Sequence, residues 1–383
     1  MTTVTRAQAL RFRAGIQQLG RGPDPDRAPT DAAVLDLGVQ VTGPAGHTWA
    51  LANRGVPTAG WEDALALAWT VRGAPHAYRR EDLPAVEVAL RPFSEADAGK
   101  RIFDANRPLK QAGIPAVEAL TRVAQRMREI VDEPRTKGEV STALSATMPE
   151  PFLRWCRACG ATHTYEQPFR LAALHAGLEL VPETSPPVLR RIADWPEVSP
   201  DLTAPPVPDP GDPHARLDLV RACVHLLGPT TPEHVAAYLD APVRDVRGRW
   251  PADAAEVIVV DENDEASPAW VLAEDLDALD SAVEPPDEPV VRLLGPFDLL
   301  LQVRDRELLV PDPDRRKELW PTLGRPGAVV VDGIPVGSWR PKATGKKLRV
   351  LTDAWSPWGR SVTARVRAQA KELAAHRGLT HQA

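Results

Sequence analysis

The sequence predicts a mixed α+β fold that is divided into several small modules. At 383 residues the chain is long enough for two to four domains. Its 40 prolines, about twice the average frequency, favour short elements and rigid loops over long helices or a wide parallel sheet. Groups of short helices followed by a pair of strands recur along the chain, and the last hundred residues are mainly predicted strands.

The first group of elements lies in residues 1–100. Segment 69–78 alternates and breaks at Gly73, as a hairpin does. Several short helices followed by a small hairpin are typical of a winged helix. The helices expected ahead of the hairpin cover 5–19, 30–37, 47–53 and 61–68.

The same pattern predicts two more winged helices, over 101–213 and 214–285. Segment 182–213 carries ten prolines and many acidic residues, so we expect a surface extension of the second module there. The expected helices are 115–131, 137–146, 151–158, 169–177, 215–227, 231–238 and 243–250, and the expected strands are 257–260 and 270–272.

The last module, 286–383, is predicted to be a small β-barrel. Two strands, 327–331 and 334–339, flank Asp332-Gly333, which is the strongest short hairpin signal in the chain. A third strand is expected over 348–352, and a helix over 362–376 ends the chain.

Composition limits the classes of function. The net charge of −6 argues against an unstructured nucleic-acid coat, but it allows a folded DNA binder with a local basic face. No apolar run reaches the ~18–20 residues of a membrane span, and residues 1–18 have no secretory pattern. Three cysteines, an odd number, favour a reducing cytosol. We therefore expect a cytoplasmic monomer that does not bind a membrane.

The segment 340–349 is the strongest local signal for a polyanion. It has five basic residues and no acidic ones around a turn at Thr344-Gly345. Basic side chains on a rigid hairpin neutralise phosphates and release counterions. The alternative is a solvated, charged turn. The five residues are Arg340, Lys342, Lys346, Lys347 and Arg349.

Gln40 is a polar side chain among apolar neighbours, just before the break at Gly43-Pro44. A buried amide without a partner costs about 1–3 kcal/mol. Its partner could be the protein's own backbone, a water molecule or a substrate.

Three other side chains are ambiguous. Asp298 is either a turn former or a functional carboxylate, and Asp63 on the predicted 61–68 helix is open to the same two interpretations. His76 lies on the first predicted hairpin, where it could reach DNA or be a surface or packed histidine.

Cys156, Cys159 and His163 have a spacing that suggests zinc. Structural zinc normally needs four ligands, and His175 is the nearby candidate for the fourth. Thiols in a core or interface are the alternative, and Cys223 is interpreted as a helix-core residue. We expect no metal and no cofactor, because the sequence has no Walker loop, no GxSxG, no HExxH and no dinucleotide fingerprint.

Several phrases resemble one known family. The chain is similar to bacterial winged-helix proteins whose characterised members are alkylpurine and crosslink-repair DNA glycosylases of the azinomycin-resistance type. The resemblance spans nearly the whole chain. The similar phrases are Gly38-Val-Gln-Val-Thr42, Trp49-Ala-Leu-Ala-Asn-Arg54, Ala68-Trp-Thr-Val-Arg-Gly-Ala-Pro-His76, Glu81-Asp-Leu-Pro84, Leu293-Leu-Gly-Pro-Phe-Asp298 and Val330-Val-Asp-Gly-Ile-Pro-Val-Gly-Ser-Trp339.

This resemblance implies three tandem winged helices and a β-barrel in a C-shape around duplex DNA. It also implies an active motif of Gln, an apolar residue, and then Gln or Asp. Gln40 keeps the first position, whereas Thr42 replaces the second polar residue. A threonine hydroxyl can hold a water molecule, but it is shorter and cannot act as a base.

The activity implied is hydrolysis of the N-glycosidic bond of N7-alkylated or crosslinked purines in double-stranded DNA. Gln40 would position water, Thr42 would assist, and Asp63 is a third catalytic candidate. His76 and the five basic residues of 340–349 would contact DNA. Two alternatives remain. Thr42 favours a DNA-binding protein or regulator that has lost glycosylase activity, and the acidic net charge favours a protein-interaction module.

Overall fold

Helices and short strands alternate along the chain in the computed structural model, which describes residues 2–43 and 45–382. The expected mixed α+β class is confirmed. Pro44 of the predicted Gly43-Pro44 break lies outside the described residues. The chain forms two compact units. Unit 1 comprises Met1–Trp61, Val220–Tyr238 and Pro251–Ala383, and unit 2 comprises Glu62–Leu219 and Leu239–Trp250. The finer division into four modules stays a prediction, as does the number of winged helices.

Unit 1 contains a five-stranded sheet formed by the C-terminal part of the chain. The strand order β12-β13-β14-β15-β16 is open, so the sheet is a half-barrel. The expected turn at Asp332-Gly333 joins β13 and β14, and both turn residues have positive φ, as a tight hairpin turn requires. The strands are β12 (Val291–Leu294), β13 (Gly327–Val331), β14 (Ile334–Thr344), β15 (Lys347–Ala354) and β16 (Thr380–His381).

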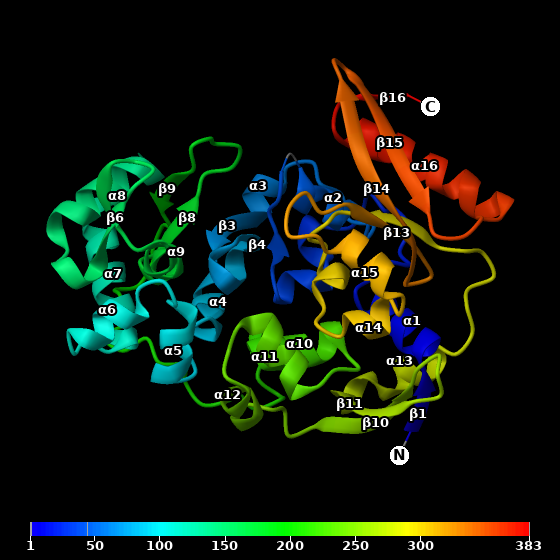
Figure 1. The fold of residues 1–383 in the computed structure, drawn as a ribbon, viewed down its shortest axis with the longest axis horizontal. Coiled ribbons are helices and arrows are strands. Elements are labelled where there is room, and N and C mark those ends of the chain that lie inside the picture. Colours follow the sequence, from blue (N-terminus) through cyan, green and yellow to red (C-terminus); the bar gives the residue numbers. More distant parts are fainter. Residues whose placement is uncertain (1, 44, 383) are drawn as a thin grey trace. The chain divides into compact units, whose positions relative to one another are not determined.

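Helix α16 (Arg360–His376) covers this sheet and packs on β12, β15 and β16. Figure 1 shows the helix in red beside the long orange β14–β15 hairpin. The core between them also takes in Trp49, a residue from the N-terminal part of the chain. Its other buried members are Val291, Leu293, Val329, Trp339, Leu348, Val366, Ala370, Leu373 and Ala374.

A second, smaller sheet in unit 1 was not fully expected. The N-terminal strand β1 (Thr2–Thr5) pairs in parallel with β10 (Ala254–Val260), which pairs antiparallel with β11 (Ala266–Leu272). Helix α1 (Arg6–Ile16) follows and buries Phe12 against this sheet. The strands predicted at 257–260 and 270–272 are confirmed within longer ones.

The remaining elements of unit 1 are short. They are η1 (Pro29–Asp31), η2 (Ala33–Asp36), β2 (Val39–Gln40), α2 (Gly46–Ala52), α10 (Leu219–Leu227), α11 (Pro232–Leu239), η7 (Ala273–Asp275), α13 (Leu276–Ser281), η8 (Leu299–Gln302), α14 (Arg306–Leu309) and α15 (Pro313–Leu319). Here α10 begins and α11 ends one residue outside the unit.

Within unit 2, the strands β4-β3-β8-β9-β5 are paired in that order, and β6 and β7 form a separate hairpin. The amphipathic helix α7 (Ala116–Ile130) packs on α9 (Glu166–His175) through buried apolar residues. The strands are β3 (Leu65–Trp69), β4 (Pro75–Arg79), β5 (Arg135–Thr136), β6 (Leu153–Cys156), β7 (Ala161–Thr164), β8 (Leu178–Leu180) and β9 (Val188–Arg191).

The other helical segments of unit 2 surround these strands. They are α3 (Trp61–Ala64), which begins at the last residue of the first segment of unit 1, η3 (Val71–Gly73), η4 (Arg80–Asp82), α4 (Leu83–Ala89), α5 (Glu95–Arg101), α6 (Asn106–Gln111), α8 (Lys137–Thr147), η5 (Glu150–Phe152), η6 (Ala215–Leu217) and α12 (Val243–Gly248).

Two of the expected helices are wrong. Segment 61–68 is helical only to Ala64 and continues as the fully buried strand β3, because a short apolar run fits either state. Segment 151–158 is no helix either: it holds the end of η5 and then strand β6, which pairs with β7 across a tight turn. Among the described residues, no helix is both long and apolar enough to cross a membrane.

Candidate DNA-binding and catalytic site

Gln40 ends the two-residue strand β2 and is half-buried, whereas Leu37 and Val39 before it are buried. Gly38 has a φ of 85°, a conformation that side-chain-bearing residues rarely adopt. The bend at Gly38 and the buried apolar neighbours therefore constrain the backbone at Gln40, which is not fully buried.

Thr42 is held against the start of helix α2. Its Oγ1 lies 2.6 Å from the position that a Cβ would take on Gly46. Any larger residue at Gly46 would therefore displace the Thr42 hydroxyl. Because Thr42 is two residues after Gln40, a side chain at position 46 would disturb one end of the candidate motif.

Helix α2 is fastened to the core beneath the half-barrel. The Trp49 indole Nε1–H donates to the Leu293 carbonyl oxygen at 2.7 Å. Thr48 Oγ1 and His376 Nε2, on α16, lie at hydrogen-bond distance, 3.0 Å. The segment that carries Gln40 and Thr42 thus leads directly into a rigid element.

Arg54 and Asp298 form a buried ion pair just after α2. Arg54 donates through Nη1 to Oδ2 of Asp298 at 2.8 Å and through Nη2 to Oδ1 at 2.9 Å, and both side chains are 1% exposed. Asp298 also accepts from the Leu300 N–H as the N-cap of η8. The turn-former interpretation of Asp298 therefore fits, and its carboxylate is not available to a substrate.

His47, the second residue of α2, is buried and packs edge-on against Trp61, with ring centroids 4.6 Å apart. Neither ring nitrogen has a hydrogen-bond partner within the described chain. Burial, and to a lesser degree the nearby His376, lower the pKa of His47 to about 4. The imidazole is therefore neutral at physiological pH.

The β14–β15 hairpin places four of its five cations on one face. Lys342 pairs with Arg349 and Thr344 with Lys347, so side chains of even number on β14 share a face with odd ones on β15. Arg340 is on that face, where its Nη1 also donates to the Gly324 carbonyl. Lys346 lies at the turn, and all five cations are exposed.

The opposite face of the β14–β15 hairpin packs against the core of the half-barrel. Leu348 is 0% exposed within the core beneath α16. Strand β16 runs parallel to β15, with Thr380 N–H bonded to Lys346 O and Gln382 N–H to Leu348 O. Trp49, close after the Gln40 segment, belongs to the same core as Leu348. Both candidate features of unit 1 are therefore built on a single core.

His76 is 0% exposed, so its side chain does not lie at the surface, where a direct contact with DNA would need it. Its Nδ1 lies 2.9 Å from Thr70 Oγ1 and 3.0 Å from Ala74 O. Burial, with a smaller contribution from Arg72, lowers the pKa of His76 to about 3. The packed-histidine alternative fits instead.

Asp63 is exposed on the short helix α3 and belongs to unit 2, whereas Gln40 and Thr42 belong to unit 1. It stays a catalytic candidate on sequence grounds alone.

The cysteines divide into two kinds. Cys223 is buried in α10, as expected, but Cys156 is half-buried and Cys159 is exposed, so neither lies in a core, and the interface half of that alternative stays a prediction. His175 is not a companion ligand, because it is buried and its Nδ1 lies 2.6 Å from Oε1 of Glu87.

Sequence reasoning did not single out Gly46, His47 or Arg54, which lie in or next to helix α2 after the Gln40 segment. One signal was present: Gly46 is the first residue of helix α2 and stands four residues after Thr42. Asp298, which pairs with Arg54, and Leu293, which accepts from the Trp49 indole, lie more than 200 residues away along the chain, so no local pattern could reveal these two contacts.

Residues 36–376 match the family model of the AlkZ-like DNA glycosylases, which covers most of the chain and begins just before Gln40. The chain belongs to this family. Among solved structures, the Streptomyces sahachiroi DNA glycosylase AlkZ is similar, with a TM-score of 0.69 and 21% sequence identity over 100% of this chain and 98% of that one. At this identity the likeness shows the fold. No curated protein matches the chain.

Membership of the AlkZ-like DNA glycosylase family confirms the resemblance found in the sequence. It makes DNA the partner and DNA repair the general role. The lesion, the residues that perform the reaction and the oligomeric state are finer questions.

Proposed function

We propose that this protein hydrolyses the N-glycosidic bond of N7-alkylated or crosslinked purines in duplex DNA. The observation that best supports the proposal concerns helix α2, which follows the Gln40–Thr42 segment. Trp49 of this helix packs in the same core as Leu348 of the hairpin that carries cations on one face. Gln40 would hold the attacking water, and the Thr42 hydroxyl, seated against Gly46, would help to place it.

The chemistry needs little more than position and charge. A purine alkylated at N7 is cationic and is already a good leaving group. A neutral amide that orients water, together with stabilisation of the developing oxocarbenium charge, is then sufficient assistance. No strong general base is required, so threonine in the second motif position is compatible with activity.

The basic face of the hairpin would supply the affinity. Arg340, Lys342, Lys347 and Arg349 point to one side, and Lys346 stands at the turn, which suits contact with a phosphate backbone. Phosphate contacts carry no sequence information, and a repair enzyme that must scan all sequences needs none from them.

Single-turnover release of 7-methylguanine from a defined duplex tests the proposal, with alkali revealing the abasic sites. Gln40→Ala is expected to lower the rate by about 10²-fold, the usual effect of removing one preorganised polar group. Thr42→Val, which keeps the shape and removes the hydroxyl, is expected to lower it more than Thr42→Ser. Gln111→Ala, at an exposed glutamine of α6, is the matched control.

Equal rates for the parent and Gln40→Ala would remove Gln40 from the mechanism. If the parent releases no base but binds duplex DNA in a salt-dependent way, the second candidate function holds. That candidate is a non-catalytic DNA-binding protein, and the observation in its favour is Thr42 in place of the second polar residue.

A further inference from the structure

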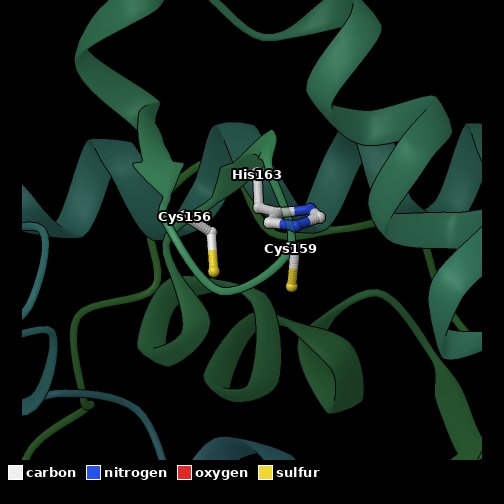
Figure 2. A group of neighbouring side chains, drawn as sticks. All are labelled: Cys156, Cys159 and His163. Atoms are coloured by element: carbon white, nitrogen blue, oxygen red, sulfur yellow. The ribbon is translucent and has the colours of Figure 1, made fainter.

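The β6–β7 hairpin of unit 2 gathers two sulfurs and an imidazole at one point. In its antiparallel register, Arg154 faces His163 and Cys156 faces Ala161, so Cys156 and His163 project from the same side. Cys159 lies in the turn between the strands. One ligand atom from each of the three residues lies within 4.8 Å of the others (Figure 2).

The turn itself has the geometry of a metal knuckle. It reads Cys-x-x-Cys-Gly, and Gly160 has a φ of 60°, which lets the chain reverse directly after Cys159. Both sulfurs point to the same side of the turn in Figure 2.

Packing does not explain these side chains. The tip of the hairpin is exposed, and Trp155, on the opposite face from Cys156, is 67% exposed. His163 Nε2 is nevertheless buried and has no hydrogen-bond partner among the described residues. An unsatisfied buried polar atom is unfavourable, and a metal ion bound through this nitrogen would satisfy it.

We propose that Cys156, Cys159 and His163 bind a Zn²⁺ ion, with a solvent molecule as the fourth ligand. Two thiolates and one imidazole form a soft donor set that suits zinc and excludes Mg²⁺ and Ca²⁺, which prefer oxygen. Tetrahedral zinc with bonds of about 2.3 Å to sulfur places two sulfurs about 3.8 Å apart. A separation within 4.8 Å therefore closes with a small side-chain rotation.

The fourth position is left to solvent for a structural reason. Among the described residues, these three form the one group of His, Cys, Asp and Glu atoms that meets the spacing for a shared ion. His175 is occupied by Glu87. Binding would release the proton of each cysteine that is still a thiol to solvent, so affinity falls as the pH falls. The ion would fix the hairpin tip that presents Trp155.

The test begins with the full-length protein, purified under reducing conditions without chelator, and uses two measurements. Elemental analysis is expected to find about one zinc per chain. Titration of the metal-free protein with Co²⁺ is expected to give visible d–d bands and thiolate-to-cobalt charge-transfer absorption. Cys159→Ser and His163→Asn are expected to weaken Co²⁺ binding by at least ~10-fold, the size of losing one ligand.

Cys223→Ala is the matched control, because it removes a thiol that lies outside the cluster, and its Co²⁺ spectrum should equal that of the parent. Far-ultraviolet circular dichroism of each variant separates loss of a ligand from loss of fold. The proposal is overturned by a parent protein without charge-transfer absorption, or by a Cys159→Ser variant that binds Co²⁺ as tightly as the parent does.

Discussion

Two hairpins in this molecule use the same backbone pattern for opposite purposes. In the β14–β15 hairpin, alternation gathers cations on one face and leaves the other face to be buried through Leu348. In the β6–β7 hairpin, alternation gathers Cys156 and His163 on one face, and the other carries the exposed Trp155. The first hairpin is stabilised by a core and by the added strand β16. The tip of the second has no such core.

The difference shows how a protein can support an exposed tip. A long hairpin can be stabilised by packing one of its faces against a core, provided that its functional side chains all lie on the opposite face. A four-residue strand pair is too short for a packed face at its tip, and an isolated hairpin is only marginally stable in water. A bound ion supplies the missing constraint at the second tip, under the proposal above.

The largest effect is expected from removing the packed face of the basic hairpin. Leu348→Ala should lower the free energy of unfolding by about 2–5 kcal/mol, because it leaves a cavity in the core beneath α16. Urea unfolding followed by tryptophan fluorescence measures this change.

Leu351→Ala is the control for that experiment. Leu351 lies three residues further along β15, on the cationic face, and is 44% exposed, so its loss should change the free energy by less than about 0.5 kcal/mol. Equal effects of the two substitutions would show that the hairpin is not held by its inner face.

A smaller effect, on binding, is expected from the cations themselves. Lys342 and Arg349 face each other across the ribbon, and the Lys342→Ala/Arg349→Ala variant should bind duplex DNA ~10-fold more weakly at physiological salt. The slope of log K against log salt should fall in magnitude by about 2, one for each lost phosphate contact. Fluorescence anisotropy between 50 and 200 mM salt, the range over which such contacts show most strongly, measures both.

The Arg154→Ala/Arg157→Ala variant removes the same charge from the β6–β7 hairpin. Arg154 interacts with the carboxylate of Asp104, so part of its charge is already offset. We expect a smaller change in slope than for the basic hairpin. An equal or larger change would reverse the assigned roles of the two hairpins in DNA binding.

The smallest effect is expected from acid, and it concerns the packed support of the basic hairpin. Burial lowers the pKa of His47 to about 4 from an unfolded value near 6.5, so the unfolded state binds more protons between these values. The contribution to stability is present above the unfolded value and is lost as the pH falls towards the folded one. Between pH 7.0 and pH 5.5 the loss should be about 1 kcal/mol.

Urea unfolding of the parent and of His47→Gln at these two pH values checks the sign. The parent should lose more stability on acidification than the variant, because only the parent has this histidine to protonate. If the two chains lose the same amount, His47 does not titrate with a lowered pKa.

Much of the fold could be predicted from local patterns. The Asp332-Gly333 turn, the amphipathic helix α7 and the strands β10 and β11 follow from turn chemistry and periodicity, which act over short distances along the chain. Strand β1 could not be predicted, because its parallel partner is more than 250 residues away. Segment 65–69 was misjudged because an apolar run of five residues fits a buried helix as well as a buried strand.

The candidate site likewise has features that the sequence predicts and features that it does not. Gln40, Thr42 and the basic segment are visible as residue types, and the alternation of β14 and β15 sorts the cations onto one face. Which side chains are buried could not be predicted from the sequence, because burial depends on packing between distant segments. In the structure His76 is buried, Asp298 pairs with Arg54 in the interior, and Cys159 is exposed.

The ion pair between Arg54 and Asp298 also has a consequence for how the protein is made. The two residues are 244 positions apart, and Arg54 is almost fully buried. In a growing chain that ends before Asp298, packing α2 would bury the Arg54 guanidinium without its carboxylate partner. Burying such an unpaired charge costs several kcal/mol. We therefore expect that a chain truncated before Asp298 leaves Arg54 without its ion-pair partner and does not seat α2 stably.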